Sequence, residues 1–232
     1  EATFVYNFSG QAIKFAQMLS LMGIKNCIVI DPQLPQTLSI ETRHRAAYYL
    51  KNAIDISKEK GYKTINIIAD LTIVHNSFFE VFSYHMKALK TRNWDVLQYC
   101  CLDHKHTEQI QELDIDFYAK TNPDLGTTEI PCIRHHWNNY GILQGRVGAP
   151  HMVPTTSNNT LAFGLKNTVF SSIEKNIQTA LGSKIEVGIF DFHGQNVQKL
   201  MMIPNLFILP KTGTQVCKTL RWHLSSYSGI AF

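Results

Sequence analysis

Three apolar runs separated by helical stretches make up most of the chain between Thr3 and Asp70. The runs, at 3–8, 27–30 and 65–68, are rich in β-branched and aromatic residues, as buried strands are. Between them, apolar residues recur every three or four positions around 13–22 and 39–60, which predicts two helices. A strand–helix–strand–helix–strand order favours a parallel sheet whose faces are covered by helices. We therefore expect an α/β fold with a mostly parallel central sheet.

The composition fits a globular domain. The chain has 232 residues, of which 44% are hydrophobic and 17% charged, enough to build one large buried core. Its net charge of +4 suits a basic cleft for an anionic ligand, whereas a nucleic-acid binder carries a dense stripe of Lys and Arg. No apolar run reaches the roughly 18 residues that a membrane-spanning helix needs. We expect no nucleic-acid partner and no transmembrane segment.

The cysteines and the first residue bear on the origin of the chain. Five cysteines are an odd number, and no pair has the CxxC spacing of a metal or redox motif. Reduced, buried thiols in an intracellular, cytoplasmic protein explain them best. Because the sequence begins at Glu1 without Met and without a signal-like stretch, we expect a segment of a longer polypeptide with neighbouring domains.

Two of the predicted strands end on a carboxylate. Asp31 follows the second strand, and Asp70 follows the third in the run Ile67-Ile68-Ala69-Asp70. Open α/β sheets bind their ligands at the carboxyl ends of parallel strands, which makes both acids candidate site residues. Each also has a structural explanation, Asp70 as a turn or helix-capping acid and Asp31 as a turn acid before proline. The phosphate-loop patterns GxGxxG and GxxxxGK[ST] and the GxSxG elbow are absent.

The region after Asp70 resembles the central segment of GT-A type glycosyltransferases. A Phe78-Phe79 helix start follows a short polar turn, and Trp94-Asp95 introduces another strand. In that family the acidic strand ends in Asp-x-Asp or Glu-Asp-Asp, which holds a metal ion and the sugar nucleotide. Here the corresponding triplet reads Ala69-Asp70-Leu71.

The rest of the chain extends this resemblance. The helix from Ser39, which carries Arg43-His44-Arg45, is similar to one in lipopolysaccharide- and collagen-modifying glycosyltransferases and in the compact glycosyltransferase domains of large algal viruses. The second half matches the family's strand and helix at 161–177, its later acid at Asp191 and its Pro-Asn-Leu strand at 203–208. The tail from Lys211 to Arg221 resembles the segment that closes the donor site.

The resemblance implies a fold and an activity. The fold would be a single GT-A-like (Rossmann-like) domain over 1–232, with a nucleotide-sugar-binding half at about 1–102 and an acceptor-binding half at about 103–232. The activity would be transfer of a hexose from a nucleoside-diphosphate sugar to a glycan hydroxyl, in a protein of viral type. A catalytically silent GT-A-like domain that binds a glycan or a partner protein is the alternative. A generic nucleotide-binding α/β protein is a third interpretation.

The resemblance also assigns roles to single residues. Asp31, Asp70, Arg43, Arg45 and Lys211 would contact the donor, since arginine is well suited to phosphate; solvated helix charges are the alternative for the two arginines. Asp191 would act as the general base that deprotonates the acceptor.

A metal ion is part of the family pattern. Mn²⁺ or Mg²⁺ would bind Asp70 together with His193, and His75 or Asp191 are other candidates for the second ligand. Because Ala69 and Leu71 replace the neighbouring acids, neutralisation of the diphosphate by Arg or Lys also stays open.

The second half of the sequence has weaker local signals. A short strand is expected at 117–119, loops over 131–160 and a helix near 195–201. Four aromatic and histidine side chains in the loop region are candidates for a platform that stacks on an acceptor sugar: His135, His136, Trp137 and Tyr140. The pairs His104-x-His106 and His135-His136 lie in expected loops, and neither pair belongs to the ligand pattern of a zinc finger.

Overall fold

The computed structural model describes residues 1–31, 42–75, 77–99, 112–144, 146–156, 160–182, 188–192, 194–204 and 206–208. The chain forms two compact units that interleave along the sequence. Unit 1 comprises Glu1–Thr72, Trp94–Gln98 and Thr155–Lys199. Unit 2 comprises Ile73–Asn93, Tyr99–Pro154 and Leu200–Phe232.

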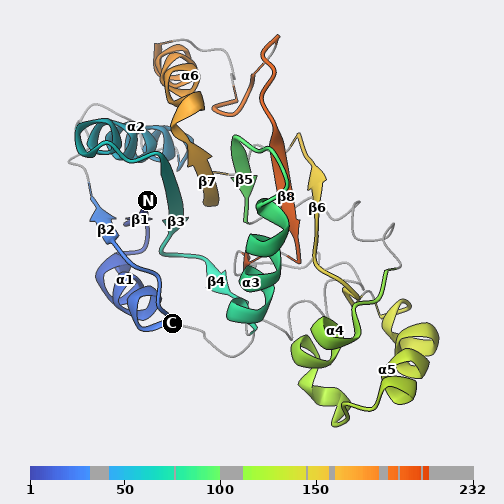
Figure 1. Ribbon diagram of the computed structural model, residues 1–232. Helices are drawn as coiled ribbons and strands as arrows, with labels where there is room; N and C mark the ends of the chain where they lie inside the picture. Colours follow the sequence, from blue (N-terminus) through green and yellow to red (C-terminus); the bar gives the residue numbers. More distant parts are fainter. Residues whose placement is uncertain are drawn as a thin grey trace. The chain divides into compact units, whose positions relative to one another are not determined.

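Unit 1 contains five strands, and the direction in which successive strands are added to the sheet reverses at β1. The strands are β1 (Ala2–Tyr6), β2 (Cys27–Ile30), β3 (Thr64–Ala69), β5 (Val96–Gln98) and β7 (Ala162–Lys166). β2 and β3 pair with opposite sides of β1, both in parallel, so the sheet grows first in one direction and then in the other. β7 lies antiparallel between β3 and β5, and β5 therefore runs in the same direction as β3 (Figure 1).

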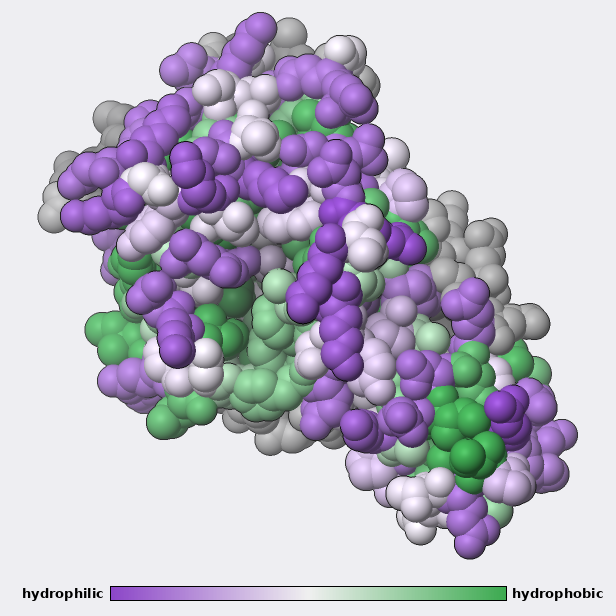
Figure 2. Space-filling view, viewed as in Figure 1, coloured by the Kyte–Doolittle hydropathy of each residue, from purple (hydrophilic) through white to green (hydrophobic). Residues whose placement is uncertain are grey.

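Helices cover this sheet in unit 1. They are α1 (Ala12–Leu21), α2 (Thr42–Lys60) and α6 (Phe170–Gly182), the last preceded by a 3₁₀ turn, η4 (Asn167–Val169). α2 and α6 pack together, and the core beneath them joins strand residues such as Phe4 and Ile67 to helix residues such as Leu50 and Ile173. The outer surfaces of α2 and α6 are largely hydrophilic (Figure 2). On α2, Lys51 pairs with Asp55 at 2.7 Å. The α/β fold with helices flanking a central sheet is thus confirmed.

Unit 2 combines short strands with a group of helices. It contains β4 (Ile73–Val74), α3 (Phe78–Leu89), α4 (Ile115–Thr121), the 3₁₀ turn η2 (Pro123–Leu125), α5 (Ile130–His136), the π-helical turn η3 (Trp137–Gly141), β6 (His151–Pro154) and β9 (Phe207–Ile208). β4 pairs with β9, and β6 with β8 (Lys199–Ile203), both antiparallel. Within unit 1 the strand order is β2-β1-β3-β7-β5, and this part of the sheet is mixed.

The predicted strand at 117–119 is wrong, because this segment lies inside α4. Asp114 caps the helix by accepting a hydrogen bond from the amide of Phe117 at 2.9 Å. Phe117 and Tyr118 are then buried, and Thr121 donates its hydroxyl to the carbonyl of Phe117 one turn back at 2.9 Å. The cap and the burial on one helix face outweigh the strand preference of the aromatic pair.

Two other local predictions also differ from the structure. The expected loops over 131–160 contain α5 and η3, because Ile133 and Trp137 pack with Tyr118 in a small core that local composition does not reveal. The expected helix near 195–201 is wrong, since residues 199–203 form β8. The apolar run there pairs with β6, with Met202 opposite Met152.

Among the helices that the structure describes, none is both long and apolar enough to cross a membrane.

Candidate functional site

Polar side chains of unit 1 gather where β1, β2 and β3 end. Asn7 follows β1 and donates its side-chain amide to the Asp31 carboxylate, which follows β2, at 2.7 Å. The hydroxyl of Tyr49, on α2, donates to the carbonyl of Asn7 at 2.6 Å and lies 3.5 Å from the other Asp31 oxygen. Because Asp31 is exposed, its carboxylate faces solvent at the point where the sheet reverses direction. Such a point is the ligand-binding crevice of open α/β sheets.

The Asp70 carboxylate holds the loop between β1 and α1. Its Oδ1 accepts the amides of Phe8 and Ser9 at 2.9 and 3.0 Å. Its Oδ2 accepts the amide and hydroxyl of Ser9 at 3.1 and 2.8 Å and the amide of Gln11 at 3.0 Å. Only 6% of Asp70 is exposed. The loop bends around the acid through Gly10, whose φ of 84° is a conformation that favours glycine.

This arrangement does not fit a metal ion at Asp70. A carboxylate offers about four lone-pair positions, and here both oxygens already accept hydrogen bonds from the loop. Within the described ranges, no group of three or more His, Cys, Asp or Glu side chains could hold a metal. His193, the second predicted ligand, lies outside the described residues. The metal therefore stays a prediction, and no chemical step is assigned to it.

Several buried polar atoms at this edge have no hydrogen-bond partner in the described part of the chain. They are the Tyr6 hydroxyl, the side-chain oxygen of Asn7, Nε of Arg45 and both amide atoms of Gln98. Tyr6 and Gln98 are fully buried, and they are the last residues of β1 and β5, which run in the same direction. An unpaired buried polar group costs about 1–3 kcal/mol, so a ligand that satisfied these atoms would gain affinity.

The two tyrosines of the edge are held in the protonated form. Burial raises the pKa of Tyr49 to about 12, and the charge of Asp31 acts in the same direction while Arg45 opposes it. Burial, followed by the neighbouring Tyr49, raises the pKa of Tyr6 well above its ordinary value. Both phenols therefore remain hydrogen-bond donors at neutral pH.

Asp191 belongs to a segment that reaches the same edge. Its neighbour Phe190 packs its ring on Phe163 in β7, with ring centroids 4.7 Å apart. Because β7 is antiparallel, its first residues lie beside the carboxyl ends of β3 and β5. Asn176 of α6 donates to the Asp191 carbonyl at 2.7 Å and fixes the backbone there.

The structure thus brings together part of the predicted site. Asp31, Asp70, Arg45 and the Asp191 segment belong to one edge of unit 1. Arg43 lies in the first turn of α2, but its side chain is outside the described part. Lys211 and Arg221 also lie outside the described residues.

The four residues proposed as a sugar platform lie in unit 2 and differ in their exposure to solvent. Trp137 is only 3% exposed and packs on Tyr118, so its face is not available to a sugar. His136 lies 3.1 Å from the Tyr118 hydroxyl through Nδ1. Tyr140 is exposed, as is His135.

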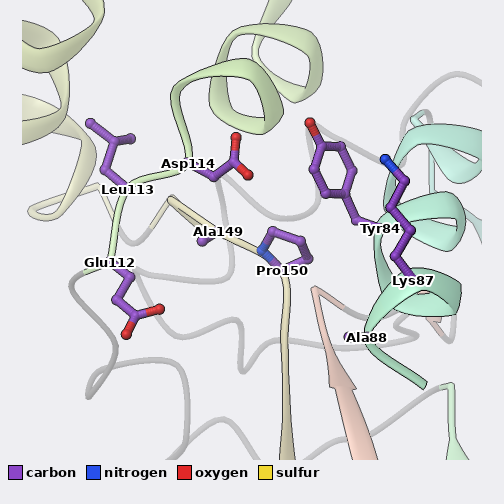
Figure 3. A pocket seen from close by; sticks show the side chains of 8 residues that line it. All are labelled: Tyr84, Lys87, Ala88, Glu112, Leu113, Asp114, Ala149 and Pro150. Carbon is purple, nitrogen blue, oxygen red and sulfur yellow. The ribbon is translucent and has the colours of Figure 1, made fainter. Parts of the chain in front are cut away.

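Unit 2 has its own concavity of about 540 Å³ (Figure 3). Tyr84, Lys87 and Ala88 of α3 form one wall; the others are formed by Glu112, Leu113, Asp114, Ala149 and Pro150. Lys87 Nζ lies 5.3 Å from the centroid of the Tyr84 ring. Asp114, one of the lining residues, also caps α4, and none of the predicted site residues lines this pocket.

Sequence reasoning missed Asn7, Ser9 and Tyr49. A usable signal existed for Tyr49, since it lies one helical turn after Arg45 and thus on the same face of α2. For Ser9 no local signal exists, because its role depends on an acid about 60 residues away.

Comparison with protein-family models gives no match, and no curated protein sequence matches the chain significantly. The geometry of the strand edge and the resemblance noted above therefore carry the functional argument.

Proposed function

We propose that unit 1 binds a nucleoside-diphosphate sugar at the carboxyl ends of β1, β2 and β3, and that the chain transfers the sugar to a glycan hydroxyl. The observation that carries the proposal is the cluster of Asp31, Asn7 and Tyr49 at the reversal of the sheet. In dinucleotide-binding α/β proteins, an acid about 20 residues after the first strand–helix turn accepts hydrogen bonds from the ribose. Asp31 follows Gly10 by a similar interval and presents an exposed carboxylate.

Aromatic rings beside this acid suit a nucleobase. Phe8 is partly exposed, and its ring lies 5.1 Å from that of Tyr49 at an interplanar angle of 34°. A base stacked on Phe8 would place its ribose near Asp31, because Tyr49 contacts both. The proposal therefore puts the nucleoside over β1 and β2 and its phosphates toward the first turn of α2.

Transfer of the sugar needs a base and stabilisation of the leaving diphosphate. Asp191 would remove the proton of the acceptor hydroxyl, which is the role that the resemblance implies. Cationic side chains, among them Arg45, would stabilise the charge that develops on the leaving group. The support is the position of the Asp191 segment and of Arg45 at the edge where Asp31 lies.

Calorimetric titration with UDP-, GDP- and dTDP-sugars tests the proposal. We expect one nucleotide to bind, and Asp31→Asn to weaken it by about tenfold or more, since a charged acceptor to the ribose is lost. Asp55→Asn, an exposed acid on α2, is the matched control and should leave affinity unchanged. If no nucleotide binds, or if both variants behave alike, the assignment is wrong.

A catalytically silent domain of the same fold is the second candidate. It is favoured by one observation, the Asp70 carboxylate that is already occupied by the loop in place of a metal. Donor consumption with a glycan mixture separates the two, because an enzyme releases nucleoside diphosphate and a silent domain does not. Asp191→Asn should abolish that release without weakening donor binding.

A further inference from the structure

We propose that the strand edge binds the diphosphate of its ligand without a divalent cation, with Arg45 supplying the positive charge. The inference rests on the proposed function, because it concerns how the same site holds its donor. It replaces the metal that the family resemblance implies with a side chain of α2.

The first argument is the state of Asp70, the acid expected to hold the metal. Five hydrogen bonds from Phe8, Ser9 and Gln11 end on its two oxygens. A cation would have to displace these donors, since Mn²⁺ and Mg²⁺ bind through the same oxygen lone pairs. The β1–α1 loop would then lose its anchor, and backbone amides would be left without partners.

The second argument concerns the place where α/β proteins often hold phosphate. The first strand–helix turn and the N-terminus of its helix attract anions through backbone amides and the helix dipole. Here the Asp70 carboxylate takes that place, since it accepts the amide of Gln11, the residue just before α1. The Asp70 carboxylate disfavours a diphosphate at this turn, because it already accepts the amides of Phe8, Ser9 and Gln11 and carries a negative charge.

The third argument is the charge at the start of α2. Its first turn contains Arg43, His44 and Arg45 and no acidic residue. Cations are unfavourable at a helix N-terminus, so this pattern lowers stability unless an anion binds nearby.

Arg45 is the cation of this turn whose side chain the structure describes. It is half-buried, and its Nε is a buried atom without a partner in the described part of the chain. Its charge acts on Tyr49, the residue whose hydroxyl contacts Asn7 and lies next to Asp31. A guanidinium can hold two phosphate oxygens at once, so Arg45 can take over the role of a metal on a diphosphate.

The test is titration of the full chain with UDP and with GDP, in EDTA and again in Mn²⁺. We expect the affinity for the nucleotide that binds to be the same in both buffers. Arg45→Gln should weaken binding by about tenfold or more, and Arg45→Lys should retain part of it. Lys51→Gln removes the same charge from an exposed position of α2 and should bind like the wild type. Circular dichroism melts verify that each variant is folded.

The outcomes separate this inference from the proposed function. Binding only in Mn²⁺ would overturn the inference and leave nucleotide binding intact. Equal losses of nucleotide affinity in Arg45→Gln and Lys51→Gln would also overturn it, since the loss would then come from the lower net charge of the protein and not from a specific contact of Arg45. No binding of either nucleotide in either buffer would overturn the proposed function and the inference together.

Discussion

Two regions differ in whether their buried polar groups are hydrogen-bonded: the carboxyl edge of unit 1, and the helical segment from Asp114 to Arg146 in unit 2. At the edge, atoms of Tyr6, Arg45 and Gln98 are buried without partners in the described residues. In the helical segment, Arg146 binds both Asp124 oxygens at 3.0 and 2.7 Å and Asn122 at 3.1 Å. A saturated network specifies a fold, whereas an unsaturated one is a cost that a ligand can remove. We therefore assign a structural role to the polar network of the helical segment and a binding role to the carboxyl edge.

Asp70 is the exception within the edge, and its removal should have the largest effect. Asp70→Ala leaves the amides of Phe8, Ser9 and Gln11 without their acceptor, so we expect a loss of about 3 kcal/mol in the free energy of unfolding. Urea unfolding measures it. Asp31→Asn is the matched control: its carboxylate is exposed, and we expect stability to change by less than about 0.5 kcal/mol. Similar stability in all three proteins would show that the loop does not depend on Asp70.

Arg146 tests the saturated network. Arg146→Gln should lower the free energy of unfolding by about 2 kcal/mol, because a buried ion pair is broken while the half-exposed Asp124 can turn to water. Nucleotide affinity should not change. Arg134→Gln, an exposed arginine on α5, is the control and should be neutral. A loss of nucleotide binding in Arg146→Gln would contradict the division between the two regions.

A pair of tyrosine variants compares the regions directly. Tyr118→Phe removes a hydroxyl that lies 3.1 Å from His136 Nδ1, and it should cost about 1 kcal/mol. Tyr6→Phe removes a buried hydroxyl without a partner, and it should be neutral or stabilise the free protein by up to about 1 kcal/mol. Thermal melts of both variants, alone and with the bound nucleotide, measure the difference. Equal destabilisation would mean that the Tyr6 hydroxyl is satisfied in the free protein.

Acid should weaken the helical segment slightly. Burial lowers the pKa of His136, with the charge of Arg146 acting in the same direction, so the folded state favours the neutral ring. Its contribution is complete above the unfolded pKa of about 6.5 and is lost as the pH falls through and below that value. We expect the free energy of unfolding to fall less between about pH 7.5 and pH 5.5 in His136→Gln than in the wild type, and urea unfolding at the two pH values measures this. His135→Gln, exposed and adjacent, should behave as the wild type does.

The sequence predicted the first half of the fold well because its signals are local. Apolar runs ending at Asp31 and Asp70, and the spacing along 42–60, identify β2, β3 and α2 without tertiary information. Two later segments were predicted wrongly: residues 117–119 as a strand, and residues from 131 onward as loops because His, Asn, Gly and Pro are frequent there. Their helices depend on the Asp114 cap and on burial of Trp137, which only the folded chain reveals.

The candidate site was predicted by position more than by contact. Strand ends in an α/β sheet identify Asp31 and Asp70, and the resemblance identifies Arg45 and Asp191. What Asp70 binds could not be read from the sequence, because its partners lie 59 to 62 residues away and are mainly backbone amides. Backbone donors carry no side-chain signature, so the difference between a metal ligand and a loop anchor appears only in three dimensions.

The anchoring of the β1–α1 loop also predicts the rate at which the amide hydrogens of this loop exchange with solvent. Exposed loops that contain glycine usually open readily, and their amides exchange quickly. The amides of Phe8, Ser9 and Gln11, however, end on a buried acid at the end of β3. They can exchange only when Asp70 withdraws, and its own amide is bound to the Tyr6 carbonyl at 3.1 Å. A loop on the surface should therefore show the slow exchange of the central strands.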